Sequence, residues 1–546
     1  MADQVGATQA FQAQAEAVIE DLLRLQPERA SSLGDHRYDD RLDDLGESGR
    51  AELRAAAVRG RDGLDSLDLD ALEPPDAVDA DVLRTALDAT LLAVDVLDEP
   101  RWNPLVWLPG EAIYSLVARD VLPAADRLSS LAARLGAVPE RLALATRTLE
   151  DMPRVHVETA MGQAAGAATL IRDEVDRLLA AEPSMASTVE PAQRAALRAV
   201  ETYRAWLEDR LPTAGRDPRL GPEVFAAKLH LGLDADLSAE QVVTRARDNL
   251  ARVTAELAAV SRDWTGQGGD DSEVIRFALD RVARDVCDDN TIVELARRTL
   301  VETTRTVAQE GLVTDPGDPC EIQVMPEFRR GVAVAYCDAP GALEDGGMTY
   351  YAISPTPADW SQDRVASFYR EYNVAMLTNL TIHEAMPGHV LQLAHNRRYA
   401  GRTRVRKVFR SGSFVEGWAV HAERLMAEAG HGGVPVRLQQ LKMQLRMTIN
   451  ALLDAGVHAG GMSQAEAMEL MTGTGFQEEG EAVGKWRRAL LTSAQLSTYF
   501  VGYAELDDVL RATGPRTAAT GRYDDVLAHG SPPPRHLRSL LAAATG

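Results

Sequence analysis

Apolar residues recur at every third or fourth position through most of this chain, and that spacing restricts its fold more than any other feature. Two stretches with this pattern are Phe11, Ala15, Val18, Leu22 and Leu25, and Val243, Ala246, Leu250, Val253, Leu257 and Val260. Each set lies on one face of a helix. The second stretch follows Ser238-x-x-Gln241, a capping-box pattern that predicts where its helix begins. The sequence therefore predicts a mainly α-helical protein.

Signals for β-strands are few and gather in one part of the chain. Ile322 and Val324 alternate with polar residues, as do Val332, Val334 and Tyr336, and the run MTYYAIS follows at 348–354. These patterns predict a small sheet near residues 320–355.

The chain is long enough for several domains, but a large helical enzyme of 546 residues can also form one body. A segment rich in proline and glycine at 210–222 is a candidate hinge. We expect a single catalytic domain over residues 1–546, either undivided or built from two lobes of about 1–215 and 216–546. Pro139 and Pro191 are expected in the first turns of helices.

Charge and cysteine content limit the compartment and the partners. The net charge of −24 makes nucleic acid and anionic lipid poor partners. Three cysteines with no close spacing indicate neither a disulfide framework nor a cysteine metal site. The first residues do not resemble a signal peptide, and no long apolar run is present. We therefore expect a cytoplasmic protein that binds neither membrane nor nucleic acid, and the sequence leaves its oligomeric state open.

A histidine pair at unusual spacing is the strongest chemical signal. His383 and Glu384 precede His389, and Pro387 and Gly388 lie between them. On a straight helix, residues six positions apart point about 120° away from each other. Proline interrupts helical hydrogen bonding and glycine permits unusual backbone angles. We therefore predict a break in the helix that turns both imidazoles toward one metal ion.

A third ligand and a supporting carboxylate are expected on a later helix. Glu416 and Glu423 are seven residues apart and share a helix face. Glu416 could bind the metal while Glu423 orients a ligand histidine. The alternative is that a histidine and a glutamate in a helix are ordinary surface residues, and the residues alone weigh these two interpretations about equally.

Several motifs resemble the DUF885 family of bacterial proteins. They are HEAMPGHVLQ, EGWAVHAE and QLSTYFVG, together with LQPERASSLGDHRYDDRLDD and LGPEVFAAKLHLGL nearer the N-terminus. The resemblance spans nearly the whole chain. Because that family looks similar in fold to M32 carboxypeptidases and related helical gluzincins, it implies a large helical body with a deep central cleft and a zinc ion at the cleft floor.

The resemblance also implies roles for individual residues. It gives metal binding to His383, His389 and Glu416, and the role of general base to Glu384. It places Tyr499 where a phenol could stabilise an oxyanion, and Arg488 where a guanidinium could pair with a substrate carboxylate. The chain departs from the family at His421, where a tyrosine is usual, and at Ser493-Ala494, where Pro-Gly is usual.

Four further candidate residues come from the chain itself. His421 could donate a hydrogen bond in the cleft, and His458 on a later helix is a second candidate catalytic histidine. Tyr350 and Tyr351 lie in a predicted strand that could pair with an extended substrate backbone.

The leading hypothesis is a zinc-dependent peptidase or carboxypeptidase that acts on short peptides; another divalent metal could replace zinc. One alternative is a metalloenzyme that cleaves a small amide or an amino-acid conjugate in a biosynthetic pathway, since fold and motif do not fix the reaction. Another is a non-catalytic relative whose cleft only binds a partner.

Overall fold

The computed structural model describes residues 2–325, 334–513 and 519–545. The chain divides into two compact units. Unit 1 comprises Met1–Pro218, Pro340–Asp345 and Arg402–Val408, and unit 2 comprises Arg219–Ala339, Gly346–Gly401 and Phe409–Gly546. The chain therefore passes between the units several times, and its organisation into one domain or two lobes stays a prediction.

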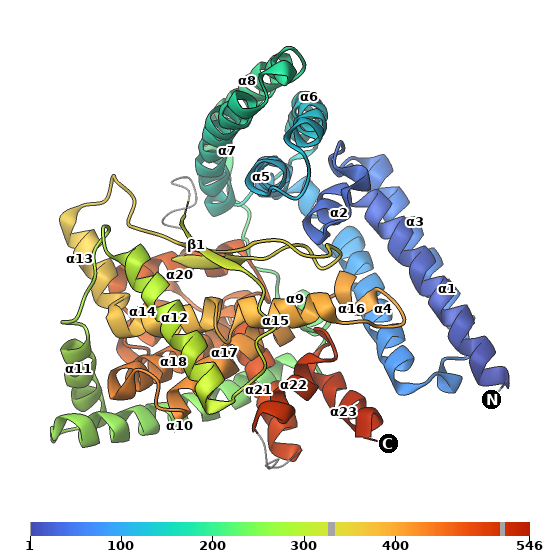
Figure 1. The fold of residues 1–546 in the computed structure, drawn as a ribbon. Helices are drawn as coiled ribbons and strands as arrows, with labels where there is room; N and C mark the ends of the chain where they lie inside the picture. Colours follow the sequence, from blue (N-terminus) through green and yellow to red (C-terminus); the bar gives the residue numbers. More distant parts are fainter. Residues whose placement is uncertain (1, 326–333, 514–518, 546) are drawn as a thin grey trace. The chain divides into compact units, whose positions relative to one another are not determined.

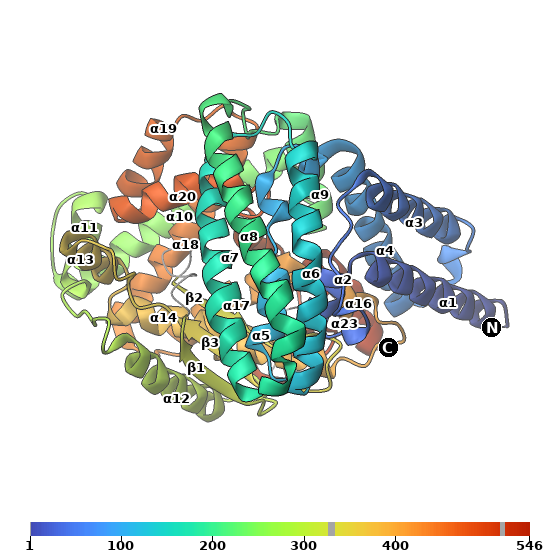
Figure 2. The same ribbon diagram turned by 90° about the horizontal axis from the view of Figure 1, so that it is seen from above.

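Unit 1 is built from helices alone among its described residues. Its α-helices are α1 (Ala2–Leu25), α2 (Pro27–Leu33), α3 (Glu47–Asp65), α4 (Pro74–Leu92), α5 (Gly110–Ala118), α6 (Ala124–Thr148), α7 (Arg154–Ala181), α8 (Ala186–Arg210) and α16 (Val405–Val408). The long helices α6, α7 and α8 lie side by side in both views (Figures 1 and 2).

Residues 402–408, which include the short helix α16, join the rest of unit 1 through polar contacts. The Oγ1 of Thr403 donates to Asp79 Oδ2 at 2.6 Å, and the Nε of Arg406 donates to Asp79 Oδ1 at 2.6 Å. Arg402 pairs with Asp76 at 2.9 Å. These acids belong to α4, so their pairing explains why residues 402–408 fold with a segment far away in the sequence.

Unit 2 holds the remaining helices and the only sheet among the described residues. Its α-helices are α9 (Pro222–Leu233), α10 (Ala239–Thr265), α11 (Asp271–Val282), α12 (Ile292–Glu310), α13 (Gln362–Glu371), α14 (Val374–Glu384), α15 (His389–Arg398), α17 (Gly412–Glu428), α18 (Gly433–His458), α19 (Gln464–Met468), α20 (Glu479–Leu491), α21 (Thr498–Ala512), α22 (Ala519–Leu527) and α23 (Leu537–Thr545). Within this unit α14 packs against α12, α17 and α18 (Figure 1).

The sheet has three strands in the order β1-β3-β2: β1 (Cys320–Val324), β2 (Ala335–Asp338) and β3 (Thr349–Ile353). The central strand β3 pairs parallel with β1 and antiparallel with β2. The sheet predicted near residues 320–355 is thus confirmed, although Val332 lies outside the described residues.

The predicted mainly helical fold is also confirmed. Ser238 caps α10: its Oγ accepts from the backbone N–H of Gln241 at 3.2 Å, and its own backbone N–H donates to Gln241 Oε1 at 2.8 Å, as the capping-box pattern predicts. Helices α14 and α17 are buried on nearly all sides, so their polar residues lie inside unit 2. Among the described helices, none combines the length and apolar character of a membrane-crossing segment.

Candidate metal centre

The chain bends sharply between the two histidines. Asn373 caps the start of α14, which ends at Glu384, and α15 begins at His389. A Cβ atom on Gly388 would lie 1.9 Å from the carbonyl oxygen of His383, so only glycine fits this close approach. The Nε1 of Trp418 donates to the carbonyl oxygen of Pro387 at 2.9 Å and fixes the bend from α17. The predicted helix break is confirmed.

The bend brings His383 and His389 together with Glu416. The ring centroids of the two histidines are 4.8 Å apart. Each presents its Nε2 to the same oxygen of Glu416, Oε2, at 3.5 Å from His383 and 3.6 Å from His389. One ligand atom from each residue therefore lies within 4.8 Å of the other two.

The donor set fits a divalent metal ion. Two imidazoles and one carboxylate are ligands typical of hydrolytic zinc sites. The Oε2 atom of Glu416 is buried and has no hydrogen-bond partner among the described residues. Burial raises the pKa of Glu416, but the two facing imidazoles lower it more, so the net shift is downward and the carboxylate stays charged. An unpaired buried carboxylate oxygen between two imidazoles is what a cation would satisfy.

Glu423 holds His383 in one orientation. The Nδ1 of His383 lies 2.7 Å from Glu423 Oε1, and the Nδ2 of Asn379 donates to Glu423 Oε2 at 2.6 Å. An Nδ1–H that donates to Glu423 leaves the Nε2 lone pair facing Glu416. The predicted contact between Glu423 and a candidate ligand histidine is confirmed. Burial lowers the pKa of His383, but the carboxylates of Glu416 and Glu423 raise it by more than burial lowers it. The net pKa of His383 therefore lies well above its ordinary value.

Glu384 lies beside this cluster at the end of α14. Its side chain is buried, and the backbone N–H of Cys337 in β2 donates to it. Burial raises the pKa of Glu384 above its ordinary value, while the charges of His389 and His383 oppose that shift. A carboxylate with a raised pKa next to a metal site can accept a proton from water.

Tyr499 and Arg488 also belong to this region. The Nη2 of Arg488 donates to the Tyr499 hydroxyl at 3.3 Å and to Gln495 Oε1 at 2.7 Å. The negative charge of Glu416 raises the pKa of Tyr499 first, and burial adds to the shift. The phenol of Tyr499 therefore stays protonated.

The structure does not bring His421 or His458 to this cluster. The ring of His421 packs against Tyr523 at 5.3 Å between centroids and against Trp418 at 6.1 Å. His458 stacks on Phe225, and its Nε2 lies 2.9 Å from the carbonyl oxygen of Ala489. Both rings are buried and pack against aromatic side chains, and their predicted catalytic roles stay predictions.

The predicted substrate strand is also wrong. Tyr350 and Tyr351 lie on β3, whose two edges are already paired with β1 and β2. No further strand can be added to it. Tyr351 is fully buried and its hydroxyl lies 3.2 Å from Thr381 Oγ1. Tyr350 faces the other side of the sheet and is partly buried, so a substrate contact there stays a prediction.

Sequence reasoning did not single out Asn379 and Trp418, which position the cluster. Asn379 lies one helical turn before His383, and Trp418 lies two residues after Glu416. A polar residue one turn from a candidate ligand was the available signal for Asn379. Nothing in the sequence indicates that Trp418 donates to Pro387.

Comparisons with known proteins agree with this fold. The profile of DUF885, described as a bacterial protein of unknown function, matches residues 27–541. A solved structure of a candidate lipoprotein of unknown function from Shewanella oneidensis is 28% identical, covers 97% of this chain and 99% of its own, and has a TM-score of 0.81. A candidate lipoprotein from Colwellia psychrerythraea is 16% identical, covers 100% of both chains, and has a TM-score of 0.80, so it shares the fold.

Other comparisons are remote or absent. Metallocarboxypeptidase 1 from Trypanosoma cruzi is 11% identical over 99% of this chain and 96% of its own, with a TM-score of 0.33. A similarity that weak does not establish a shared fold. No curated protein sequence matches the chain.

The prediction of a cytoplasmic protein is contradicted by these relatives. Both similar solved structures are described as candidate lipoproteins, which are membrane-anchored rather than cytoplasmic proteins. The prediction depended on the opening residues, the cysteine count and the absence of a long apolar run. A lipid anchor needs only an acylated residue and no spanning segment, so none of those features tests for one.

Proposed function

The chain belongs to the DUF885 family of bacterial proteins of unknown function, and we propose that it is a zinc-dependent hydrolase that cleaves amide bonds in short peptides. The observation that carries this proposal is the convergence of His383, His389 and Glu416 on one buried position. Surface histidines and acids do not need the support that Glu423 and Asn379 give to His383. That support is typical of metal sites.

The proposed reaction uses one acceptor and one donor from this chain. When bound, zinc supplies a Lewis acid that polarises a carbonyl and makes water a nucleophile at neutral pH. Glu384 takes the proton from the attacking water and returns it to the leaving amine. Its burial and its place beside His383 support this role.

Tyr499 would stabilise negative charge on the oxygen of the scissile carbonyl. Its hydroxyl is held by Arg488, which leaves the phenol proton free to point elsewhere. The phenol lies close enough to Glu416 for that charge to dominate its pKa. A donor fixed next to the metal position acts where charge develops in the transition state.

The test is a comparison of the wild type with Glu384→Gln. The purified wild-type protein with zinc should cleave members of a short-peptide library, and Glu384→Gln should lose that cleavage by about 1,000-fold or more while it binds zinc equally well. Zinc content is measured by elemental analysis, and its position by anomalous scattering from a crystal.

Glu428→Gln is the matched control, because Glu428 lies on α17 with a 51% exposed side chain that pairs only with Arg424 among the described residues. It should leave both zinc content and cleavage unchanged. A protein that binds no zinc between His383, His389 and Glu416, or a Glu384→Gln variant with wild-type activity, would refute the proposal.

A further inference from the structure

A cavity of about 520 Å³ lies within unit 2, and its wall is distinct from the candidate metal centre. The wall comes from α11, α13, α18 and α19 and from the segment that joins α19 to α20. None of the residues that line it belongs to the cluster of His383, His389 and Glu416. Small-molecule sites in proteins have volumes of about 300 to 1,000 Å³, so this cavity can hold a ligand of that size.

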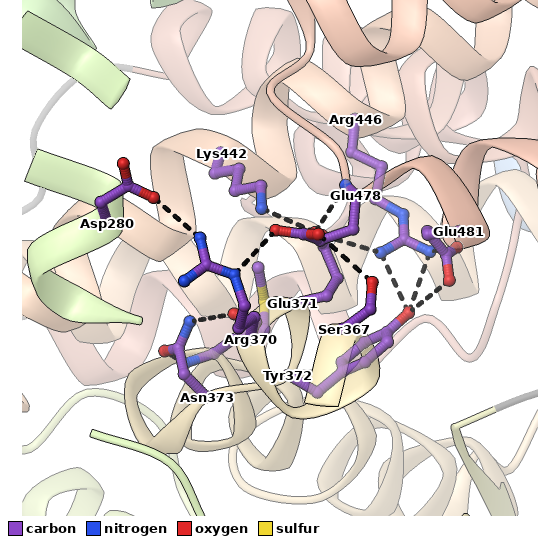
Figure 3. A network of polar contacts seen from close by, with 11 residues as sticks. Asp280, Ser367, Arg370, Glu371, Tyr372, Asn373, Lys442, Arg446, Glu478 and Glu481 are labelled. Atoms are coloured by element: carbon purple, nitrogen blue, oxygen red, sulfur yellow. Dashed lines mark hydrogen bonds and ion pairs between the residues drawn. The ribbon is translucent and has the colours of Figure 1, made fainter. Parts of the chain in front are cut away.

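The cations of the wall do not offer a buried, unpaired positive charge. Arg370 pairs with Asp280 at 2.8 Å, and Lys442 donates to Glu371 Oε2 at 2.9 Å (Figure 3). Arg276, the remaining cation of the wall, is exposed, so water and salt screen its charge. An anionic ligand would therefore have to compete with ion pairs that already exist, and the wall favours a ligand that is neutral where it is recognised.

Two buried glutamines of the wall have side-chain atoms without a hydrogen-bond partner among the described residues. Gln439 on α18 is 1% exposed, and its Oε1 has no donor. Gln477 is 5% exposed, and neither its Oε1 nor its Nε2 has a partner. Buried polar atoms are rarely left in this state, because the loss of their hydration is costly. Together the two side chains offer two acceptors and one donor to a molecule in the cavity.

The backbone around Gln477 holds this residue in place. A π-helical turn at Glu469–Thr474 precedes it, and Phe476 adopts a left-handed conformation with φ of 53°. The backbone N–H of Gln477 donates to the carbonyl oxygen of Met471 at 3.1 Å. Such turns and strained residues are frequent at functional sites. Because the residue is fixed before a ligand arrives, a contact with it costs little conformational entropy.

The chemical group that matches the three unpaired atoms is a primary carboxamide. Its NH₂ group has two N–H donors, one for Gln439 Oε1 and one for Gln477 Oε1, and its carbonyl oxygen accepts from Gln477 Nε2. A carboxylate has no donor and an ammonium group has no acceptor, whereas a secondary amide or a single hydroxyl has only one donor. Among these groups, only the primary carboxamide can satisfy all three atoms.

We propose that this cavity is a second ligand site of the protein and binds small molecules that carry a primary carboxamide. The apolar residues of the wall, Leu279, Met468 and Phe476, pack against the apolar part of such a ligand. This site is independent of the proposed hydrolysis, so the failure of either proposal leaves the other standing.

The test is calorimetry on the full-length, zinc-free protein with three probes: 3-phenylpropanamide, N,N-dimethyl-3-phenylpropanamide and 3-phenylpropanoate. The probes share their apolar part and differ in the polar group. The primary amide should bind about 10-fold or more tightly than either of the others, because each of those leaves buried glutamine oxygens without a donor. Equal binding of the three probes, or no binding of the primary amide, would overturn the inference.

The Gln477→Leu substitution tests the assigned residue. It should remove most of the preference for the primary amide without lowering the melting temperature, because it replaces a buried polar group that lacks a partner. Gln440→Leu is the matched control. Gln440 is as buried as its neighbour Gln439, but it does not line the cavity, and its Oε1 accepts from Arg437 at 2.6 Å. The control should keep the preference, and a preference that survives in Gln477→Leu would contradict the assignment.

Ala465→Trp gives a check that leaves the protein core unchanged. Ala465 lines the cavity and is exposed, so a larger side chain there narrows the cavity without disturbing the fold. The variant should bind 3-phenylpropanamide at least about 10-fold more weakly than the wild type. Wild-type affinity in this variant would mean that the amide binds elsewhere, and the inference would fail.

Discussion

Gly417 of α17 and Gly502 of α21 meet backbone to backbone. A Cβ atom on Gly417 would lie 2.4 Å from the carbonyl carbon of Gly502, and one on Gly502 would lie 1.8 Å from the carbonyl oxygen of Ser413. The two helices can therefore approach more closely than side chains normally allow. Glu416 precedes the first glycine, and Tyr499 lies one turn before the second, so this contact sets their separation.

Gly502→Ala should destabilise unit 2 and disturb the candidate centre. Since the methyl group would meet backbone atoms that no rotamer change can move, we expect a loss of about 3 kcal/mol in the free energy of unfolding. Urea denaturation measures that loss, and zinc titration should show weaker binding in the variant that still folds.

Gly484→Ala is the matched control for this substitution. Gly484 is exposed within α20, and a Cβ atom there would meet nothing within 4 Å. Alanine should stabilise this helix by up to about 1 kcal/mol. If both substitutions cost the same, the close approach of α17 and α21 does not matter for stability.

Glu423→Gln should weaken zinc binding without removing a ligand. The amide can keep a contact with His383 but no longer offers a charged acceptor for Nδ1–H, so the orientation and basicity of the imidazole are less well fixed. Loss of such a partner typically costs about 10- to 100-fold in metal affinity. Competition with a chromogenic chelator measures the change, and an unaltered affinity would show that Glu423 does not support the site.

The sequence predicts local features of the site better than its surroundings. The bend between His383 and His389 follows from Pro387 and Gly388, which are adjacent in the chain, and the partner role of Glu423 follows from helix spacing. The burial of His458 and Tyr351 results from tertiary packing, which no local pattern in the sequence reports.

The two prolines illustrate the same limit for the fold. Pro139 and Pro191 are typical of helix starts, yet both lie inside longer helices, α6 and α8. A proline inside a helix costs about 3 kcal/mol. The extensive packing of α6 and α7 against α8 can offset that cost. This packing cannot be predicted from the local sequence around either proline.

His421 should make the protein sensitive to mild acid. Burial lowers the pKa of this histidine to about 3, and neither ring nitrogen has a hydrogen-bond partner among the described residues. The unfolded chain, with an ordinary pKa near 6.5, binds a proton at pH 5 while the folded protein does not, so stability falls as the pH drops below about 6.5.

Replacement of His421 by phenylalanine tests the direction of this pH dependence of stability. Between pH 8 and pH 5 the wild type should lose about 2 kcal/mol that His421→Phe does not lose. Urea denaturation of both proteins at the two pH values measures this difference in unfolding free energy. The comparison of the two proteins at pH 8 is the internal control, because His421 is neutral at that pH in the folded and the unfolded chain. Parallel losses in the two proteins would show that His421 does not titrate on unfolding.

Glu505 should have the opposite effect on the pH profile. It is 7% exposed, and burial raises its pKa to about 7, although the backbone N–H of Asp236 donates to it at 3.1 Å. Between about pH 4.5 and 7 the folded protein therefore holds a proton that the unfolded chain has released. The stability that this group contributes is complete below about pH 4.5 and is lost as the pH rises through 7.

Glu505→Gln keeps an acceptor for Asp236 and removes the titration. From pH 5 to pH 8 the wild type should lose about 2 kcal/mol relative to the variant, so the variant gains in relative stability at alkaline pH whereas His421→Phe gains in acid. Urea denaturation at pH 5, 6.5 and 8 separates the two effects by their sign. If the difference in unfolding free energy between the wild type and Glu505→Gln stays constant across this pH range, the carboxyl group of Glu505 ionises in the folded protein as readily as in the unfolded chain. That result would contradict the effect of burial on its pKa.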